Sequence, residues 1–452
     1  MRVIIIGAGE VGSSIAAMLS RENNDVIVIE KSEEIVKNVM NSSLDAQIIR
    51  SDGLSPTVLE EAGIKDTRML IAVTNVDETN IVACLLAKEY NVPLKIARIR
   101  SPELSSKDFF IPHETLGIDF VINPDQIIAE EIKSLIKMPG ATNLFDFADG
   151  LVKLIGIKVD QDSSVVNKSL KELRDLSPGT SFVVVSVLRH DKLIIPKGDD
   201  TIIAEDQLFI IAKSDSTDTI MSLFGKNQNN SKNGKKVMII GGGRIGRSIA
   251  LELEKEHLSI TLIEKDKDKC QLLASQSDKI LVLNGDGTDE NLLLEEGIKD
   301  TAVFIATTND EETNLLTSLL AKHHKVSKTI ALINKKEYFP LLPSVGIDVP
   351  ISPRQYTANA ILKYVRRGRI LSMATISETD AETLEMIAPP FSKIINTPLK
   401  KLKLPSGAII GAIVHGQEVF IPIGDDIIQP DDRVIIFAIP SAIPSLEKLF
   451  EG

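Results

Sequence analysis

The chain has 452 residues, of which 43% are apolar and 25% charged, and its formal net charge at pH 7 is −12. The length predicts two to four domains of ordinary globular composition, and the negative charge argues against a general nucleic-acid binder. No apolar run reaches the roughly 18 residues of a membrane helix. Two isolated cysteines, Cys84 and Cys270, provide neither a disulfide framework nor a zinc site. We therefore expect a cytoplasmic protein without a metal centre.

A glycine-rich turn opens the chain and is repeated 234 residues later. The two copies are Gly7-Ala8-Gly9-Glu10-Val11-Gly12 and Gly241-Gly242-Gly243-Arg244-Ile245-Gly246. Each copy follows an apolar run and precedes a helical pattern. In that setting the first glycine makes the tight turn, the second lets the backbone approach a pyrophosphate, and the third allows close helix–strand packing. The N-terminus of the following helix offers free N–H groups to phosphate.

An acidic residue stands eighteen positions after each turn, at the end of an apolar run. These residues are Glu30, after residues 26–29, and Glu264, after residues 260–263. A carboxylate at this position accepts hydrogen bonds from both ribose hydroxyls and repels a 2′-phosphate. A single G-x-G-x-x-G is weak evidence, but the same turn and the same acid at one spacing, twice, predict two dinucleotide-binding sites.

The first part of the chain alternates short apolar strands with helical patterns, which predicts a doubly wound parallel sheet. The predicted strands are residues 3–6, 26–29, 47–49, 69–73, 94–99 and 120–122. The predicted helices are residues 11–21, 33–40, a segment between Ser55 and Gly63, and residues 77–90, 102–109 and 124–137.

Beyond residue 138 the pattern changes to a small α+β module, and then the whole arrangement repeats. The module has predicted strands at residues 151–159, 181–189, 192–195 and 207–212, and two short helices at 170–176 and 216–223. We predict two Rossmann-like doubly wound parallel sheets, each followed by a small α+β module, from a tandem duplication. The predicted domains are lobe 1 (1–138), module 1 (139–225), a linker (226–235), lobe 2 (236–366) and module 2 (367–452).

Two further polar signatures end predicted strands and recur at the same offset. They are Asp52 with Asp286, and Thr74-Asn75 with Thr308-Asn309. Ligands of doubly wound sheets lie beyond the carboxyl ends of the strands, so these residues are candidates for nucleotide contacts. Two alternatives stay open, because an Asp-Gly pair also forms turns and Thr74-Asn75 can cap a helix.

The two lobes differ in charge at matching positions, which predicts different ligand preferences. Glu10 in the first turn becomes Arg244 in the second, and Arg98 at the fifth strand becomes Leu332. Arg244 can clamp a terminal phosphate, and Arg98 can reach phosphate from the opposite side of its site. We expect NAD or NADH in lobe 1, and either NAD or NADH or an adenine nucleotide such as ATP or ADP in lobe 2.

Catalytic groups are not apparent. None of the six histidines has metal-ligand spacing or a neighbouring nucleophile, and no Walker-type phosphate loop occurs. Acidic pairs in the modules, Asp199-Asp200 and Asp425-Asp426, follow a glycine and either form turns or line a rim that touches cations or partners. No catalytic residue and no metal ligand is predicted.

The order of these motifs resembles the regulator-of-potassium-conductance (RCK) family. The matching motifs are the glycine turn, the strand-end Glu, Asp-Gly, Gly-Ile-Lys-Asp-Thr and Thr-Asn-x-Asp-Glu-x-Asn, while Pro-x-Gly-Asp-Asp resembles the companion C-terminal domain. Two such units in one chain resemble the peripheral subunits of bacterial and archaeal Trk potassium uptake systems. The resemblance covers nearly the whole chain.

The resemblance implies a nucleotide-binding subunit that gates a TrkH-type potassium-translocating membrane protein without doing chemistry. It also implies a homo-oligomeric ring, a tetramer of tandem chains, at the inner face of the membrane. The family's sites match Gly7 to Val11, Glu30, Thr74, Asn75 and Arg98 in lobe 1, and Gly241 to Ile245, Glu264, Thr308 and Asn309 in lobe 2. An NAD-dependent oxidoreductase and a nucleotide sensor for another cation transporter or antiporter are the alternatives.

Overall fold

The computed structural model describes the chain except for residues 23, 42–43, 107, 178, 191, 227–235, 366–369, 377–380 and 452. It forms two compact units that do not follow the order of the chain. The first unit contains residues 1–129 and 352–365, and the second contains residues 130–351 and 366–452. The predicted linker lies outside the described residues except for Lys226.

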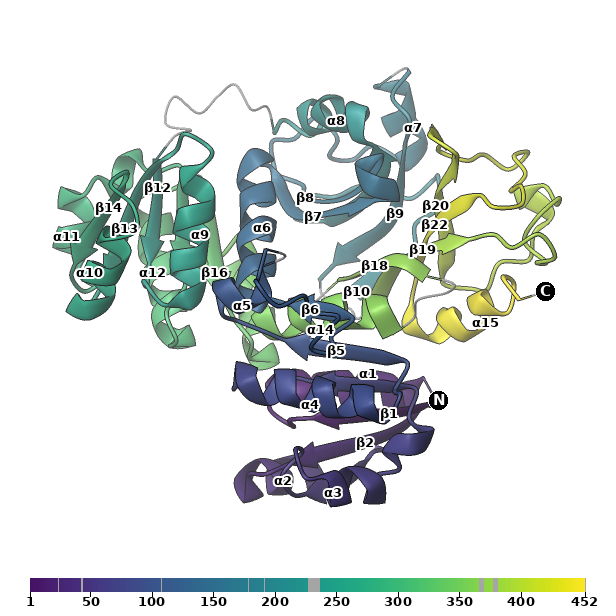
Figure 1. Cartoon of the computed structure of the whole chain (residues 1–452). Helices are drawn as coiled ribbons and strands as arrows, with labels where there is room; N and C mark the ends of the chain where they lie inside the picture. Colours follow the sequence, from purple (N-terminus) through teal and green to yellow (C-terminus); the bar gives the residue numbers. More distant parts are fainter. Residues whose placement is uncertain are drawn as a thin grey trace. The chain divides into compact units, whose positions relative to one another are not determined.

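The first unit is built on a parallel sheet of six strands (Figure 1). The strands are β1 (Arg2–Ile6), β2 (Asp25–Glu30), β3 (Gln47–Arg50), β4 (Met69–Ala72), β5 (Leu94–Arg98) and β6 (Phe120–Ile122). Their order is β3-β2-β1-β4-β5-β6, so the strand order reverses between β1 and β4. Strand β1 is apolar and buried from Val3 to Ile6, as is typical of a strand inside a parallel sheet that is covered on both faces. The fold predicted for lobe 1 is confirmed.

The helices of this unit come from two distant parts of the sequence. They are α1 (Glu10–Arg21), α2 (Glu33–Met40), α3 (Pro56–Glu61), α4 (Asp77–Glu89), α5 (Pro102–Ser105), the start of α6 (Pro124–Lys137) and α14 (Pro353–Val365). Helix α14 packs against α1 and β6, where the Tyr364 and Phe120 rings stack with their centroids 3.9 Å apart. A helix that follows the second sheet in sequence therefore completes the first.

The second unit contains the repeated parallel sheet. Its strands are β12 (Lys236–Ile240), β13 (Ser259–Glu264), β14 (Ile280–Asn284), β15 (Val303–Ala306), β16 (Lys328–Leu332) and β17 (Val349–Ile351), in the order β14-β13-β12-β15-β16-β17. Its helices are α9 (Arg244–Glu254), α10 (Lys267–Ala274), α11 (Glu290–Glu295), α12 (Glu311–His323) and α13 (Leu342–Val345). The strand order matches that of the first sheet, which confirms the tandem duplication.

The second half of α6 packs beside this repeated sheet. Lys133 of α6 pairs with Glu252 at 2.7 Å and with Glu256 at 3.1 Å, and Lys137 pairs with Glu256 at 3.0 Å. These carboxylates stand on α9 and directly after it, and Figure 1 shows α6 alongside α9. Helix α6 therefore belongs to the second unit from residue 130 onward.

Each parallel sheet is followed by an antiparallel sheet of five strands. The first contains β7 (Ala141–Phe147), β8 (Val152–Lys158), β9 (Phe182–Arg189), β10 (Lys192–Ile194) and β11 (Gln207–Lys213), with α7 (Leu170–Asp175) and α8 (Thr217–Leu223). The second contains β18 (Ile370–Ile376), β19 (Ala381–Ile387), β20 (Ala408–His415), β21 (Glu418–Phe420) and β22 (Arg433–Ala438), with α15 (Ile443–Glu447). Residues of both sheets, such as Phe209 and Phe437, share one apolar core.

The structure differs from the prediction at one strand and one helix. Strand β7 is not among the predicted strands, although it pairs with β8 over most of its length. The Pro139-Gly140 pair before it and the polar residues Thr142 and Asn143 hide its pattern. Helix α5 ends at Ser105 rather than near residue 109. The acidic pairs of the modules do close turns, because Asp200 accepts from the Lys197 N–H at 2.7 Å and Asp426 from the Ile423 N–H at 2.7 Å.

Candidate nucleotide-binding sites

The first glycine turn joins β1 to α1 at the carboxyl edge of the sheet. Gly7 has φ of +100°, a conformation that favours glycine, and a Cβ on Gly12 would lie 1.9 Å from the Gly7 carbonyl oxygen. By contrast, a Cβ on Gly9 would meet no atom within 4 Å. Gly7 and Gly12 are therefore required by the fold, whereas the space beside Gly9 is open for a ligand. The second turn repeats this pattern at Gly241, Gly246 and Gly243.

The predicted ribose carboxylate of lobe 1 also holds the glycine turn in place. Glu30 Oε2 accepts from the Ala8 N–H at 2.7 Å, and Oε1 accepts from the Ser32 N–H at 2.8 Å. A carboxylate offers about four lone-pair positions, so two remain for ribose hydroxyls. The Ala8 N–H is thus engaged by Glu30 and does not point to phosphate, which leaves the first-turn amides of Glu10 and Val11 for that role.

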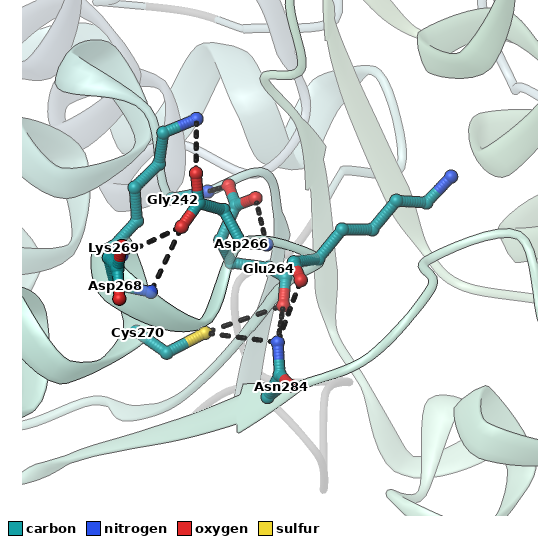
Figure 2. A network of polar contacts seen from close by, with 8 residues as sticks. Gly242, Glu264, Asp266, Asp268, Lys269, Cys270 and Asn284 are labelled. Atoms are coloured by element: carbon teal, nitrogen blue, oxygen red, sulfur yellow. Dashed lines mark hydrogen bonds and ion pairs between the residues drawn. The ribbon is translucent and has the colours of Figure 1, made fainter.

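Glu264 repeats this geometry in lobe 2 (Figure 2). Its Oε2 accepts from the Gly242 N–H at 2.6 Å and its Oε1 from the Asp266 N–H at 2.9 Å. Gly242 stands at the position of Ala8 in lobe 1. A Cβ on Gly242 would lie 3.1 Å from the Glu264 Cβ, so the glycine leaves more room beside Glu264.

A cavity of about 200 Å³ lies at the carboxyl edge of the second sheet. Of the residues predicted for lobe 2, those that line it are Gly241, Gly243, Glu264, Asp286, Thr308 and Asn309. Arg244 is exposed at the start of α9, as Glu10 is at the start of α1. The structure therefore brings the second glycine turn, the carboxylate and two further strand ends around one hollow.

Two lysines also line this cavity and are absent from the prediction. Lys265 Nζ lies 3.0 Å from Asp286, and Lys269 lines the same wall from α10. The Thr288 N–H, which donates to Asp286 at 2.9 Å, holds the pKa of that carboxyl below its usual range. A signal for Lys265 was available, because Lys31 also directly follows the carboxylate of lobe 1 and lies 3.6 Å from Asp52. Lys269 has no such signal, since Ile35 occupies its position in lobe 1.

Asp52 and Thr74 have structural partners of their own. Asp52 Oδ1 accepts from the Leu54 N–H at 3.0 Å, so the Asp-Gly turn is present. Thr74 does not cap α4. Instead its N–H and hydroxyl both donate to Asn80 Oδ1, at 2.9 and 2.8 Å.

The buried Asn80, the last residue of the Thr-Asn-x-Asp-Glu-x-Asn motif, links two strand ends through its side chain. Its amide donates to the Thr74 carbonyl at 3.1 Å and to the Arg98 carbonyl at 2.7 Å, which ties the ends of β4 and β5 together. Asn314 makes the same bonds in lobe 2, to Thr308 at 3.1 Å and to Leu332 at 3.0 Å.

Arg98 is a buried cation beside the lobe 1 strand ends. Only 4% of its surface is exposed. Its terminal nitrogens donate long hydrogen bonds to the Val73 carbonyl at 3.4 Å and to Asn75 Oδ1 at 3.5 Å. Among the described residues, its Nε has no hydrogen-bond partner. Buried charges are stable when they are paired, so this guanidinium fits an anionic ligand. Leu332 is buried at the matching position in lobe 2.

Within the described ranges, no helix is long and apolar enough to cross a membrane, and no group of three or more His, Cys, Asp or Glu residues is arranged to hold a metal ion.

The comparisons with known proteins match the whole chain. The TrkA-N domain model matches residues 3–124 and 237–353, and the TrkA-C domain model matches residues 154–225 and 384–451. The chain is 36% identical to the Trk system potassium uptake protein TrkA of Halomonas elongata, covering 100% of this chain and 99% of that protein. It is 36% identical to the protein of the same name from Vibrio alginolyticus, with the same coverage.

Solved structures share the fold. The GsuK RCK domain aligns with a TM-score of 0.62 at 18% identity, covering 99% of this chain and 94% of that one. The GsuK channel bound to NAD aligns with a TM-score of 0.62 at 18% identity, over 99% and 78% of the two chains. With both domain models matched twice and relatives matched over their full length, the chain belongs to the TrkA family of Trk system potassium uptake proteins.

Proposed function

We propose that this chain is a cytoplasmic, nucleotide-binding regulatory subunit that gates a potassium-translocating membrane protein of the TrkH type. The observation that carries the proposal is the repeated strand-end site, in a chain that is similar over its full length to potassium uptake proteins. Association with the inner face of the membrane would then run through the transporter.

The residues present fit an adenine nucleotide in both lobes. The open space beside Gly9 and Gly243 admits phosphate next to the first-turn amides of α1 and α9. The two unused lone-pair positions on Glu30 and on Glu264 match a pair of ribose hydroxyls. A bound nucleotide supplies phosphate charge and ribose hydroxyls as an effector.

The two lobes would prefer different nucleotides. Arg98 gives lobe 1 a buried cation, which suits the pyrophosphate of NAD or NADH. Lobe 2 has Leu332 there, but Lys265 and Lys269 line its cavity, and Arg244 adds a positive charge at the start of α9. We propose NAD or NADH for lobe 1, and NAD, NADH, ATP or ADP for lobe 2.

Gating follows from differential binding. A nucleotide shifts two arrangements of the lobes only if it binds them with different affinity. Moving a gate from mostly closed to mostly open takes ~5.5 kcal/mol of such difference. Several sites that each contribute a coupling of ~1–3 kcal/mol can supply it together, which favours a ring of duplicated lobes.

A ring of tandem chains is supported by apolar side chains that recur on one helix of each lobe. Val82 and Leu85 of α4 are 39% and 38% exposed, and Leu316 and Leu319 of α12 are 49% and 46% exposed. The second pair follows the first at the 234-residue offset of the duplication. Neighbouring exposed apolar side chains on one helix are where we place the association surface, since contiguous exposed apolar patches mark interaction sites.

Calorimetric titration of NADH, NAD, ATP and ADP into the full chain tests the proposal, with Glu30→Ala and Glu264→Ala beside the parent. We expect binding without turnover, and each substitution should remove one site. Nicotinamide-dependent turnover of a substrate would instead favour the oxidoreductase. Binding that leaves potassium flux through a reconstituted TrkH-type protein unchanged would favour a sensor for another transporter.

A further inference from the structure

The residue paired with the ribose carboxylate differs between the lobes. In the parallel register, Glu264 of β13 is opposite Asn284 of β14, and Glu30 of β2 is opposite Arg50 of β3. The two carboxylates accept the same pair of backbone hydrogen bonds, so this position is one place where the sites diverge.

Asn284 holds the backbone on which Glu264 stands (Figure 2). Its amide nitrogen Nδ2 donates to the Glu264 carbonyl at 3.1 Å and to the Lys265 carbonyl at 2.8 Å. The Gly285 N–H donates to the same Glu264 carbonyl at 3.0 Å. Two consecutive carbonyls at the end of β13 are thus fixed by one side chain.

Cys270 adds a second contact from α10. Its thiol donates to the Glu264 carbonyl at 3.4 Å, and Asn284 Nδ2 lies 3.8 Å from the sulfur. Burial raises the pKa of the Cys270 thiol, which keeps the proton on sulfur for this bond. The end of β13 is therefore held from the neighbouring strand and from the helix that follows it.

Lobe 1 uses these two positions differently. Val36 replaces Cys270, and the Arg50 guanidinium pairs with Glu33 at 2.8 Å, where both side chains are about half exposed. Arg50 thus extends to a neighbouring helix rather than to the backbone of Glu30.

We propose that Asn284 is a positioning residue of the lobe 2 site, which fixes the Glu264-Lys265 backbone so that the Glu264 carboxylate meets both hydroxyls of an adenosine ribose. This inference rests on the proposed function. The same backbone also carries Lys265, whose ammonium nitrogen lies 3.0 Å from Asp286, and both residues line the cavity. Lobe 2 therefore selects ribose over deoxyribose more strongly than lobe 1.

The test compares ADP, the portion that NAD and ATP share, with 2′,3′-dideoxyADP, which lacks the hydroxyls that Glu264 accepts. Both are titrated into the full chain carrying Glu30→Ala, so that lobe 2 is read alone. Asn284→Leu removes the amide, and Asn284→Arg introduces the residue that lobe 1 tolerates in the same register. In both variants the affinity for ADP should fall about two- to tenfold, the effect of one ordinary hydrogen bond. The affinity for the dideoxy nucleotide should stay within about twofold of the parent.

The ratio of the affinities for ADP and 2′,3′-dideoxyADP distinguishes a positioning role of Asn284 from a merely structural one. Equal losses for both nucleotides, or no loss for either, would overturn the inference. As a matched control, Arg50→Leu in a chain carrying Glu264→Ala should leave the ratio in lobe 1 unchanged, and a fall as large as that in lobe 2 would also count against it. If the parent binds no adenine nucleotide, the proposed function fails first and the inference with it.

Discussion

The ammonium nitrogen of Lys328 lies 2.7 Å from the carbonyl oxygen of Leu135, which places a buried cation of β16 against the last turn of α6. The same nitrogen lies 2.8 Å from the Ala141 carbonyl and 3.3 Å from the Met138 carbonyl. Carbonyls at the end of a helix have no partner within it and carry the negative end of its dipole. Lys328 therefore donates hydrogen bonds to backbone carbonyls where α6 ends and β7 begins.

Replacing this lysine by methionine should make stability depend differently on pH. Burial lowers the pKa of Lys328 to about 7, against opposing attraction from Asp348 and Glu131 and with further repulsion from Lys322. Because the unfolded chain keeps this proton up to about pH 10.4, it binds more protons than the folded chain above pH 7. Stability from this group therefore rises with pH, by up to about 1.4 kcal/mol per unit.

We expect the difference in thermal midpoint between parent and Lys328→Met to grow between pH 7 and pH 9. The variant should be less stable throughout, by about 1–3 kcal/mol, because buried carbonyls lose their donor. Lys137→Met, which removes an exposed lysine of α6, the helix that Lys328 contacts, is the control and should show no such trend. A difference in thermal midpoint that stays constant from pH 7 to pH 9 would contradict the lowered pKa of Lys328.

Substitutions at two of the three glycines of the first turn, Gly9 and Gly12, should separate binding from folding. Gly9→Ala should leave the free energy of unfolding within about 0.5 kcal/mol of the parent, since its Cβ points into open space. Nucleotide affinity in lobe 1, read with lobe 2 silenced by Glu264→Ala, should fall at least about tenfold, because the methyl group occupies the space for phosphate. Gly12→Ala should destabilise the chain by about 3 kcal/mol or more, since its Cβ meets the Gly7 carbonyl. Nucleotide binding to Gly9→Ala at the parent's affinity would exclude the proposed phosphate position.

Removing the buried cation of lobe 1 should weaken binding without weakening the fold. Arg98→Leu introduces the residue that lobe 2 carries, and it removes a charge whose Nε has no partner among the described residues. A charge-assisted hydrogen bond contributes about 1.5–3 kcal/mol, so NADH affinity in lobe 1 should fall about tenfold or more. Calorimetry and thermal melting of the nucleotide-free chain measure the two effects. A large loss of stability with unchanged affinity would assign Arg98 to the fold instead.

Charges placed on the recurring apolar pairs should disrupt the ring. The double variant Leu85→Glu, Leu319→Glu should lower the mass found by light scattering, while nucleotide binding in each lobe is retained. Leu272→Glu is the control, because Leu272 of α10 is 49% exposed and has Asn38 at its matching position in lobe 1. An unchanged mass for the double variant would remove this surface from the proposed assembly.

Much of the site was readable because it depends on short-range rules. The local sequence predicts a glycine turn followed by a helix, and the structure has Gly7 and Gly241 at φ +100° in these turns. The repeat of Glu30 as Glu264 predicted where the second strand of each sheet ends. The role of Asn80 was not readable, since an asparagine inside a helix pattern does not reveal that it bridges Thr74 and Arg98. The contacts of Asn284 depend in the same way on which strand lies beside β13.

The sequence by itself determined the duplicated parallel sheets, their glycine turns and the acids that follow them, because strand periodicity and turn chemistry act over a few residues. Only the tertiary structure decided that α14 packs against α1 and that α6 ends beside Lys328. An amphipathic helix shows that it must bury one face, and its sequence does not specify which distant surface covers that face. That choice rests on packing between residues far apart in the chain.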